Sequence, residues 1–220
     1  MDILKRILLK QAIARKIVVF LLKLHTKVYL MIGRFSCAAE GGLHPKHRLM
    51  DYHKFFVDNI SENDSVLDIG CGNGALSFDI AKKAKFVRGM DINKENIDSC
   101  KNKYMSENID YAIGDATRDL TTRCFDVVTL SNVLEHIDDR VGFLKKLSVV
   151  STKLIIRVPM FNRDWVTLYK HELGLSYMLD PTHKIEYTMD SFKDELSRSG
   201  FKINDYVIQF GEIWAVCGKD

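Results

Sequence analysis

One stretch of nine residues, 66–74, constrains the fold more than any other part of the sequence. An apolar run, Val-Leu-Asp-Ile, is followed by glycines at alternate positions, Gly70, Gly72 and Gly74, and then directly by a helical pattern. Because glycine lacks a Cβ atom, such a turn can tighten and let a ligand touch the main chain. The following helix presents unpaired N–H groups, which suit a carboxylate or a phosphate. The stretch therefore predicts a ligand-binding strand–turn–helix unit.

An acidic residue stands where such a unit would bind a sugar. Asp91 ends the next apolar run, 21 positions after Gly70, and a carboxylate there accepts hydrogen bonds from ribose hydroxyls in mononucleotide-binding units. The glycine spacing is Gly-x-Gly-x-Gly and differs from that of the dinucleotide fingerprint. We interpret the strand, glycines, helix, second strand and acid, in this order, as a nucleoside site; a merely structural turn is the alternative.

From Ser65 onward the hydrophobic pattern alternates between strands and helices. Short apolar runs predict strands over 66–69, 86–90, 111–113, 125–130 and 154–158. Helical periodicity predicts helices over 75–83, 94–103 and 141–150. Short apolar strands joined by crossover helices indicate an α/β fold with a mostly parallel sheet covered on both faces.

The last part of the chain follows a different pattern. Residues 160–188 are mixed and aromatic without a clear period, and we interpret them as a lid or acceptor-binding loop. A helix over 191–199 is expected to end at Gly200. Two strands, 206–210 and 213–217, follow with only two residues between them, which predicts an antiparallel hairpin.

The first 34 residues form a separate compositional block. Eight Lys and Arg residues stand against one acid, Asp2, while apolar residues recur at helical spacing. We predict a basic, imperfectly amphipathic helix, or two, as an extension or cap over 1–42, followed by one main domain over 43–220. Such a helix suits an anionic membrane surface. A cap packed over the ligand cleft is the alternative.

Composition excludes several classes of protein. With 46% hydrophobic and 28% charged residues, the chain is neither collagen-like, nor a coiled coil, nor disordered. A net charge of +3 does not by itself indicate a nucleic-acid binder. Five scattered cysteines without a Cys-x-x-Cys pair argue against a disulfide framework and a zinc site. The sequence has no uncharged apolar run of ~18 residues and fits a signal peptide poorly. We therefore expect a cytoplasmic protein. If the basic block docks on a membrane, we expect the protein to be peripheral on its inner face.

The sequence resembles class I S-adenosylmethionine-dependent methyltransferases, in particular small-molecule enzymes of the ubiquinone and polysaccharide pathways. The family's motifs appear in order as the glycine stretch 66–74, Gly-Met-Asp at 89–91, Ile-Gly-Asp-Ala at 113–116 and the run from Phe125 to His136. The resemblance covers about residues 43–219. It implies S-adenosylmethionine as cofactor and a Rossmann-like sheet of seven strands whose last strand is antiparallel, in agreement with the terminal hairpin.

The same resemblance implies the cofactor-binding residues. The glycine turn would pass the methionine end, Asp91 would hold the ribose, Asp115 would meet the adenine, and Ser131 and Asn132 would lie near the sulfonium. The full predicted set is Arg48, Asp68, Gly70, Cys71, Gly72, Asn73, Gly74, Asp91, Ile92, Asp115, Ala116, Ser131 and Asn132. Arg48 is included because a guanidinium can grip the cofactor carboxylate with two hydrogen bonds; a solvated basic loop is the alternative.

Three residues are candidates for catalysis. The cofactor's methyl group is already activated, so the protein has to align an in-line attack and take a proton from the acceptor hydroxyl. Glu135 and His136 follow the fourth strand, at the edge where ligands bind, and His136 is the first candidate base. His183 is the second; a structural role is the alternative for each. Some relatives bind a metal through Glu-x-x-Glu-His at this point, but Asn132 stands at the first position, so we expect no metal.

We therefore expect a methyltransferase acting on a hydroxyl of a small molecule or of a lipid- or sugar-linked intermediate. Aromatic and methionine side chains in 160–188 suit an apolar, planar or sugar-like acceptor; ordinary packing is the alternative. One rival is an RNA or nucleotide methyltransferase, which would prefer a basic face beside the cleft; we consider nucleic acid an unfavoured partner. Another rival is a non-catalytic cofactor-binding protein on the same fold. The sequence leaves the oligomeric state open.

Overall fold

The computed structural model describes residues 10–42, 44–120 and 124–220. These residues form two compact units. The first consists of the chain up to Met50 together with Asp164–Leu179, and the second of Asp51–Arg163 together with Asp180–Asp220. Residues 164–179 therefore group with the N-terminal segment, whereas we expected the whole of 160–188 to belong to the main domain. The basic and apolar residues predicted as helical within 1–9 lie outside the described residues.

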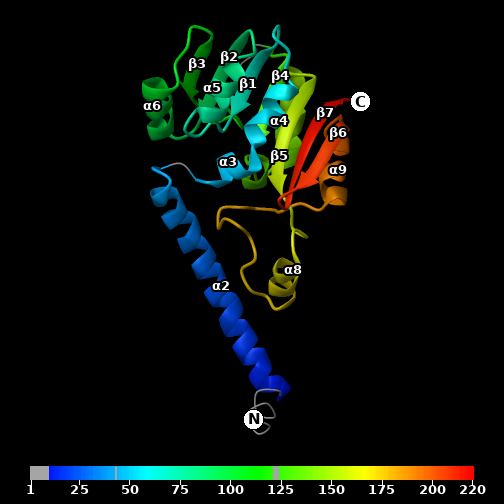
Figure 1. Ribbon diagram of the computed structural model, residues 1–220. Helices are drawn as coiled ribbons and strands as arrows, with labels where there is room; N and C mark the ends of the chain where they lie inside the picture. The colour runs from blue at the N-terminus through cyan, green and yellow to red at the C-terminus, as the bar shows by residue number, and fades with distance from the viewer. Residues whose placement is uncertain (1–9, 43, 121–123) are drawn as a thin grey trace. The chain divides into compact units, whose positions relative to one another are not determined.

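The second unit is built on a seven-stranded sheet with the order β3-β2-β1-β4-β5-β7-β6 (Figure 1). Its strands are β1 Ser65–Ile69, β2 Phe86–Asp91, β3 Ile109–Ile113, β4 Val127–Ser131, β5 Lys153–Pro159, β6 Phe201–Gln209 and β7 Glu212–Lys219. The first five strands pair in parallel, and β7 runs antiparallel between β5 and β6. The predicted Rossmann-like sheet with its terminal hairpin is confirmed.

Three of the helices described in the second unit begin at a capping side chain. The helices described in this unit are α4 Tyr52–Asp58, α5 Ala75–Ala81, α6 Lys94–Lys103, the 3-10 turn η1 Leu134–His136, α7 Arg140–Val150 and α9 Met189–Arg198. The side chains of Asn93, Asp139 and Thr188 accept main-chain N–H groups in the first turns of α6, α7 and α9. The helices predicted here agree with the structure to within about two residues at each end.

Both faces of the sheet are covered, which explains why its strands appear as apolar runs in the sequence. All but the first residue of β5 is buried. Because side chains alternate along a strand, Leu67 packs into the core cluster with Phe143 of α7 and Phe192 of α9. Asp68, next in the chain, points the other way and bonds to Ser77 of α5. Burying a large apolar side chain stabilises such a core by about 1.5–3 kcal/mol.

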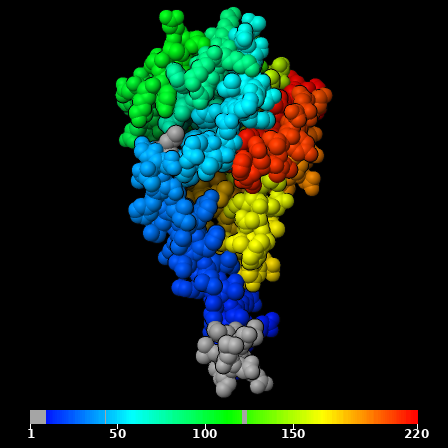
Figure 2. All heavy atoms as spheres, in the orientation of Figure 1, coloured from blue at the N-terminus to red at the C-terminus, as the bar shows by residue number. Residues whose placement is uncertain are grey.

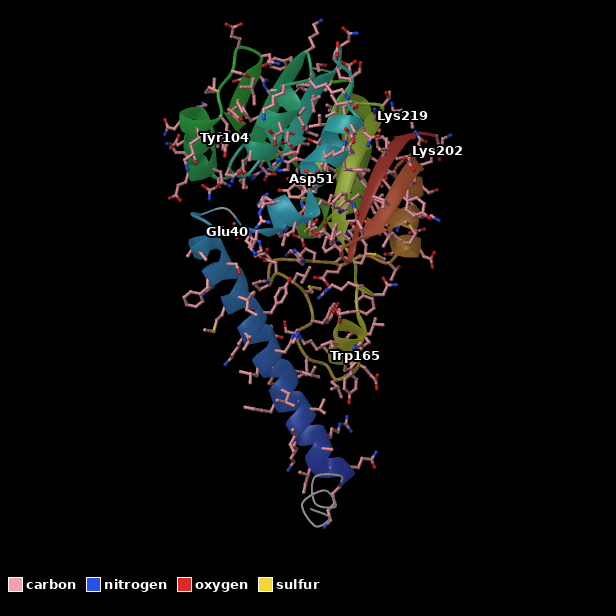
Figure 3. All side chains as sticks on the ribbon, in the orientation of Figure 1. Glu40, Asp51, Tyr104, Trp165, Lys202 and Lys219 are labelled. Carbon is pink, nitrogen blue, oxygen red and sulfur yellow. The ribbon has the colours of Figure 1, made fainter. Side chains whose placement is uncertain are left out.

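The first unit is helical. It contains α2 Gln11–Ala39, α3 Lys46–Met50 and α8 Trp165–Glu172. The Nζ of Lys170 in α8 donates to the hydroxyl of Thr26 in α2 at 2.8 Å. Trp165 begins α8 and is 72% exposed (Figure 3). None of the helices in the described ranges has the length and apolar character needed to pass through a bilayer.

One of the two expectations for these segments agrees with the structure and the other is corrected. Of the predicted one or two helices, a single helix covers the described part of the basic block. Over 165–172 the structure forms a helix where we expected irregular backbone. Asp164 caps it by accepting the N–H of Thr167 at 2.7 Å. With only eight residues, α8 makes about two turns, too few for a helical period to be recognised.

Candidate active site

A cavity of about 640 Å³ lies at the carboxyl ends of the parallel strands of the second unit. The strand order reverses between β1 and β4, and ligands of α/β sheets bind at such a switch point. The volume is typical of a small-molecule site. From the predicted set, the cavity is lined by Gly70, Asp91, Ile92, Asp115, Ala116, Asn132 and His136.

The turn after β1 needs glycine at two positions. Gly70 has φ of +67°, and a Cβ atom there would lie 2.5 Å from Cγ2 of Val133. Gly74 has φ of +84°, and its Cβ would lie 2.8 Å from Sγ of Cys100. The turn is thereby pressed against the segment after β4 on one side and against α6 on the other. Gly70 lines the cavity, while Gly72 and Gly74 shape the turn behind it.

Asp91, at the end of β2, is held in a fixed orientation at the cavity wall. Its Oδ2 accepts the N–H of Gly72 at 2.9 Å, and its Oδ1 accepts the N–H of Asn93 at 2.8 Å. The side chain is 8% exposed. Each carboxylate oxygen keeps a further lone pair, so the group can accept two more hydrogen bonds without moving. This arrangement fits the paired hydroxyls of a ribose.

Asp115, after β3, offers a second acceptor to the cavity. Its Oδ1 accepts both the hydroxyl and the N–H of Thr117, at 2.7 and 2.9 Å. Arg118 pairs with Oδ2 at 3.0 Å. The hydrogen bonds from Thr117, followed by the charge of Arg118, hold the pKa of Asp115 below its usual value. The ionised carboxylate can accept a hydrogen bond from an amino group such as that of adenine.

Asp68 is buried outside the lining of the cavity, and its contact with the cofactor stays a prediction. Its carboxylate is 1% exposed and accepts the hydroxyls of Ser77 at 2.5 Å and Thr129 at 2.7 Å. Burial raises the pKa of Asp68 above its usual value. The side chain thus ties β1 to α5 and β4 directly below the glycine turn.

Four further residues of the predicted cofactor set are engaged elsewhere. Cys71 is buried, and Oδ1 of Asn73 accepts the N–H of Ala75 at 3.1 Å. The hydroxyl of Ser131 accepts from Arg157 at 3.2 Å. Arg48 belongs to the first unit, where it pairs with Glu40 at 3.3 Å. A contact of Arg48 with the cofactor stays a prediction.

The three predicted catalytic residues come together beside the cavity. Glu135 is fully buried; its Oε1 accepts from Asn132 at 2.7 Å. Its Oε2 is buried without a hydrogen-bond partner in the described part of the chain. Burial raises the pKa of Glu135 to about 7. Nε2 of His183 lies 4.0 Å from the Glu135 carboxylate, and the rings of His183 and His136 meet edge to face with centroids 4.8 Å apart.

His136 is oriented by a short chain of hydrogen bonds. Its Nδ1 lies 2.9 Å from the hydroxyl of Thr182, and that hydroxyl donates to Oδ1 of Asp180 at 2.5 Å. A hydroxyl has one proton to donate, so Thr182 accepts from a protonated Nδ1. The ring therefore keeps its free lone pair on Nε2. Burial, and then the neighbouring His183, lower the pKa of His136, so the ring is neutral at pH 7.

The same three side chains could hold a cation. Glu135, His136 and His183 offer atoms that lie within 4.8 Å of one another, and a carboxylate with two imidazoles is a donor set that transition metals accept. The expectation that no metal is bound rested on Asn132, whose amide donates to Glu135. That expectation stays a prediction.

Sequence reasoning missed the contribution of α7. Phe143 and Lys146 line the cavity, and Nζ of Lys146 donates to the carbonyl of Thr117 at 2.7 Å. No motif marks these residues, since their place depends on how α7 packs against the sheet. The helical period of 141–150 indicates a buried side for Phe143 but does not distinguish core from cavity wall.

Comparisons with known proteins agree with this geometry. A family model described as a methyltransferase domain matches residues 67–152. The ubiquinone biosynthesis O-methyltransferase of Coxiella burnetii is 28% identical over 54% of this chain and 56% of that protein. The enzyme of the same name from Pelagibacter ubique is 33% identical over 56% of this chain and 52% of that protein. The chain spans about half the length of these curated relatives.

Solved structures show the same fold. Magnesium protoporphyrin IX methyltransferase from Synechocystis PCC 6803, with bound SAH, superimposes with a TM-score of 0.64 at 17% identity, covering 80% of this chain and 83% of that chain. A second structure of that protein, with bound SAM, gives a TM-score of 0.58 at 16% identity and covers 79% of each chain. Together with the domain match over residues 67–152 and the cavity at the sheet edge, this fold supports a class I S-adenosylmethionine-dependent methyltransferase family.

Proposed function

We propose that this chain transfers the methyl group of S-adenosylmethionine to a hydroxyl group of a small-molecule acceptor. The observation that carries the proposal is the polar arrangement around one cavity. Asp91 offers two fixed oxygens to a ribose at one part of its wall, and His136, with Nε2 as its free base atom, lies at another. The first feature suits the methyl donor and the second suits an acceptor that has to lose a proton.

Residues of the second unit would bind the cofactor as follows. Asp91 accepts the ribose hydroxyls, Asp115 accepts the adenine amino group, and Gly70 allows the chain to pass close to the methionine end. Asn132, with φ of +56°, also lines the cavity. When bound, the cofactor supplies an activated methyl group on a sulfonium. The protein's contribution is to align the acceptor oxygen for in-line attack.

His136 acts as the general base in this proposal. Its Nε2 takes the proton of the acceptor hydroxyl as the oxygen attacks, and Thr182 with Asp180 stabilises the imidazolium that forms. Such proton transfer contributes typically about 10²- to 10⁴-fold to a rate. Glu135, buried beside the two imidazoles, favours positive charge on them once it is ionised.

The preference for an oxygen acceptor is supported by the relatives. Both curated relatives described above are named as O-methyltransferases of ubiquinone biosynthesis, so a hydroxyl on a ring compound is the first acceptor to test. A lipid- or sugar-linked hydroxyl is the second. An RNA acceptor remains the alternative function and is part of the same test.

The experiment is a methyl-transfer assay with labelled S-adenosylmethionine and a set of catechols, phenols and sugar alcohols, with an unstructured RNA as comparison. We expect labelled ether from a hydroxylated small molecule. His136→Ala should lower kcat by about 100-fold or more while the affinity for S-adenosylhomocysteine stays within about twofold. Label on RNA alone, or tight cofactor binding without transfer to any acceptor, would contradict the proposal.

Thr182 gives a matched pair of variants. Thr182→Val keeps the shape and removes the hydroxyl, whereas Thr182→Ser keeps the hydroxyl. We expect Thr182→Val to lower kcat by about tenfold and to change the pH profile, and Thr182→Ser to retain activity. In the wild type the rate should rise with pH and reach half of its maximum below pH 6.5, the ordinary pKa of a histidine, since the pKa of His136 is lowered.

A further inference from the structure

The first unit carries a surface that methyl transfer does not use. Along α2, six large apolar side chains recur at helical spacing and are 38–68% exposed. They are Ile17, Phe20, Leu24, Val28, Met31 and Phe35, which we call the apolar face. At about 100° per residue they share one side of the helix. Atoms of α2 (blue) are visible at the surface in the space-filling view (Figure 2).

The other side of α2 is the one that packs within the first unit. Leu22 is the buried residue of the helix, and Lys170 of α8 reaches His25 and Thr26 at 3.2 and 2.8 Å. On a helix Leu22 and Thr26 lie about 160° from the middle of the apolar face, and His25 lies about 100° from it. The contacts of α8 therefore leave the apolar face uncovered within this unit.

A stripe of positive charge runs beside the apolar face. Lys16, Lys23, Lys27 and Arg34, which we call the basic stripe, recur at spacings of 7, 4 and 7 residues and fall within about 40° of one another on the helix. The stripe is centred about 80° from the middle of the apolar face. No Asp or Glu occurs anywhere in Gln11–Ala39, so no charge within the helix neutralises the stripe.

The apolar face and the basic stripe together indicate which kind of partner covers this surface. A second copy of α2 would bury the apolar face, but it would also bring two unneutralised basic stripes close together, which is unfavourable. A nucleic acid would neutralise the stripe and leave the apolar side chains in water. An anionic bilayer satisfies both features, because apolar side chains enter the acyl boundary while Lys and Arg reach the phosphates.

We propose that α2 binds in the plane of an anionic lipid bilayer through the apolar face and the basic stripe. The proposal is independent of methyl transfer, since it uses no residue of the cavity. Each Lys or Arg near an anionic surface contributes about 1 kcal/mol, equivalent to about fivefold in binding, and this attraction is screened by salt.

The experiment measures co-sedimentation of the full chain with vesicles of phosphatidylcholine alone and of phosphatidylcholine mixed with phosphatidylglycerol. We expect at least about tenfold stronger partitioning onto the anionic vesicles at low salt, and loss of that preference at about 1 M salt. Equal binding to both vesicle types, or to neither, would overturn the proposal.

Matched variants separate the two features of the surface. Replacing all four residues of the basic stripe by Gln should remove the preference for anionic vesicles. The control removes four exposed charges from the second unit: Lys101, Lys103, Lys145 and Lys193, each to Gln. Phe20→Ser with Phe35→Ser should weaken binding about tenfold or more. Its control is Val149→Ser with Tyr206→Ser, which removes apolar side chains exposed in the second unit.

Two measurements keep the outcome clear. Affinity for S-adenosylhomocysteine shows that each variant retains a folded second unit. Light scattering of the wild type gives its mass in solution. A stable dimer broken by Phe20→Ser and Phe35→Ser, without vesicle binding, would assign the surface to a second copy. Binding of RNA through the basic stripe without vesicle binding would assign it to nucleic acid, and either result overturns the proposal.

Discussion

The sheet edge of the second unit and helix α2 of the first unit represent two different ways of preparing a surface for binding. At the sheet edge, Asp91 and Asp115 are already oriented by hydrogen bonds from the protein itself, and Gly70 allows the turn to lie close against Val133. On α2, many apolar side chains and a stripe of Lys and Arg contribute without any one being specifically oriented. We therefore expect single substitutions to weaken binding at the sheet edge, whereas several substitutions together are needed to weaken binding by α2.

The largest effect should follow from adding one carbon atom to the glycine turn. Gly70→Ala places a Cβ atom 2.5 Å from Val133 at φ of +67°, which forces the turn away from the segment carrying Asn132. We expect affinity for S-adenosylhomocysteine, measured by calorimetry, to fall by about 100-fold or more.

The control for that variant is Gly200→Ala. Gly200 also has positive φ, +83°, but a Cβ atom there meets nothing within 4 Å. Gly200→Ala therefore measures only the destabilisation caused by an alanine at positive φ, and it should leave cofactor affinity unchanged. Equal affinity losses in the two variants would mean that the close approach to Val133 is unimportant.

Next in size is the effect of Glu135 on stability. Its pKa is about 7 in the folded chain, against 4.5 when exposed, chiefly because it is buried. The folded state therefore binds the proton more tightly, and ionisation destabilises it as pH rises from about 4.5 through 7. Relative to wild type, Glu135→Gln should gain up to about 3 kcal/mol in free energy of unfolding between pH 5 and pH 8.

Denaturant unfolding at several pH values measures this difference, with Glu107→Gln as the variant that removes a surface carboxylate. If the Glu135→Gln curve ran parallel to that of the wild type across this range, the carboxylate would not be titrating in a buried position.

A smaller effect is expected at the ribose contact. Asp91→Ala removes both acceptor oxygens and leaves the N–H groups of Gly72 and Asn93 without their partner. Cofactor affinity should weaken by roughly 1–3 kcal/mol. Wild-type affinity in a calorimetric titration would move the ribose contact elsewhere.

The smallest effect concerns metal. We expect methyl transfer to be unchanged after treatment with EDTA and dialysis, because Asn132 replaces the acid at the first position of the metal-binding pattern. Metal binding by Glu135, His136 and His183 would be shown instead by two results together. The wild type would lose activity after EDTA treatment and regain it with a divalent cation, and Glu135→Gln would not regain activity with that cation.

The sequence was sufficient for most features that depend on neighbours in the chain. The strand–glycine–helix unit, the position of Asp91 and the terminal hairpin follow from local periodicity and turn chemistry, and the structure has all three. Glu135, His136 and His183 could be identified singly as candidates, from their positions after the fourth strand and in the segment 160–188.

Features that depend on packing could not be predicted. Asp68 stands in the same motif as Gly70, but strand alternation turns it toward Ser77 and away from the cavity. The hydrogen bonds joining Asp180, Thr182 and His136 link residues 46 positions apart. The cavity wall formed by Phe143 and Lys146 depends on the docking of α7, and the short helix α8 offers too few turns for a period to emerge.

A crystal structure of the chain with S-adenosylhomocysteine would examine the cavity directly. We predict that the nucleoside lies at the carboxyl ends of β1, β2 and β4, with both ribose hydroxyls within hydrogen-bonding distance of the Asp91 carboxylate and the sulfur on the side of His136. A nucleoside bound at another site, or one whose ribose hydroxyls face away from Asp91, would contradict it.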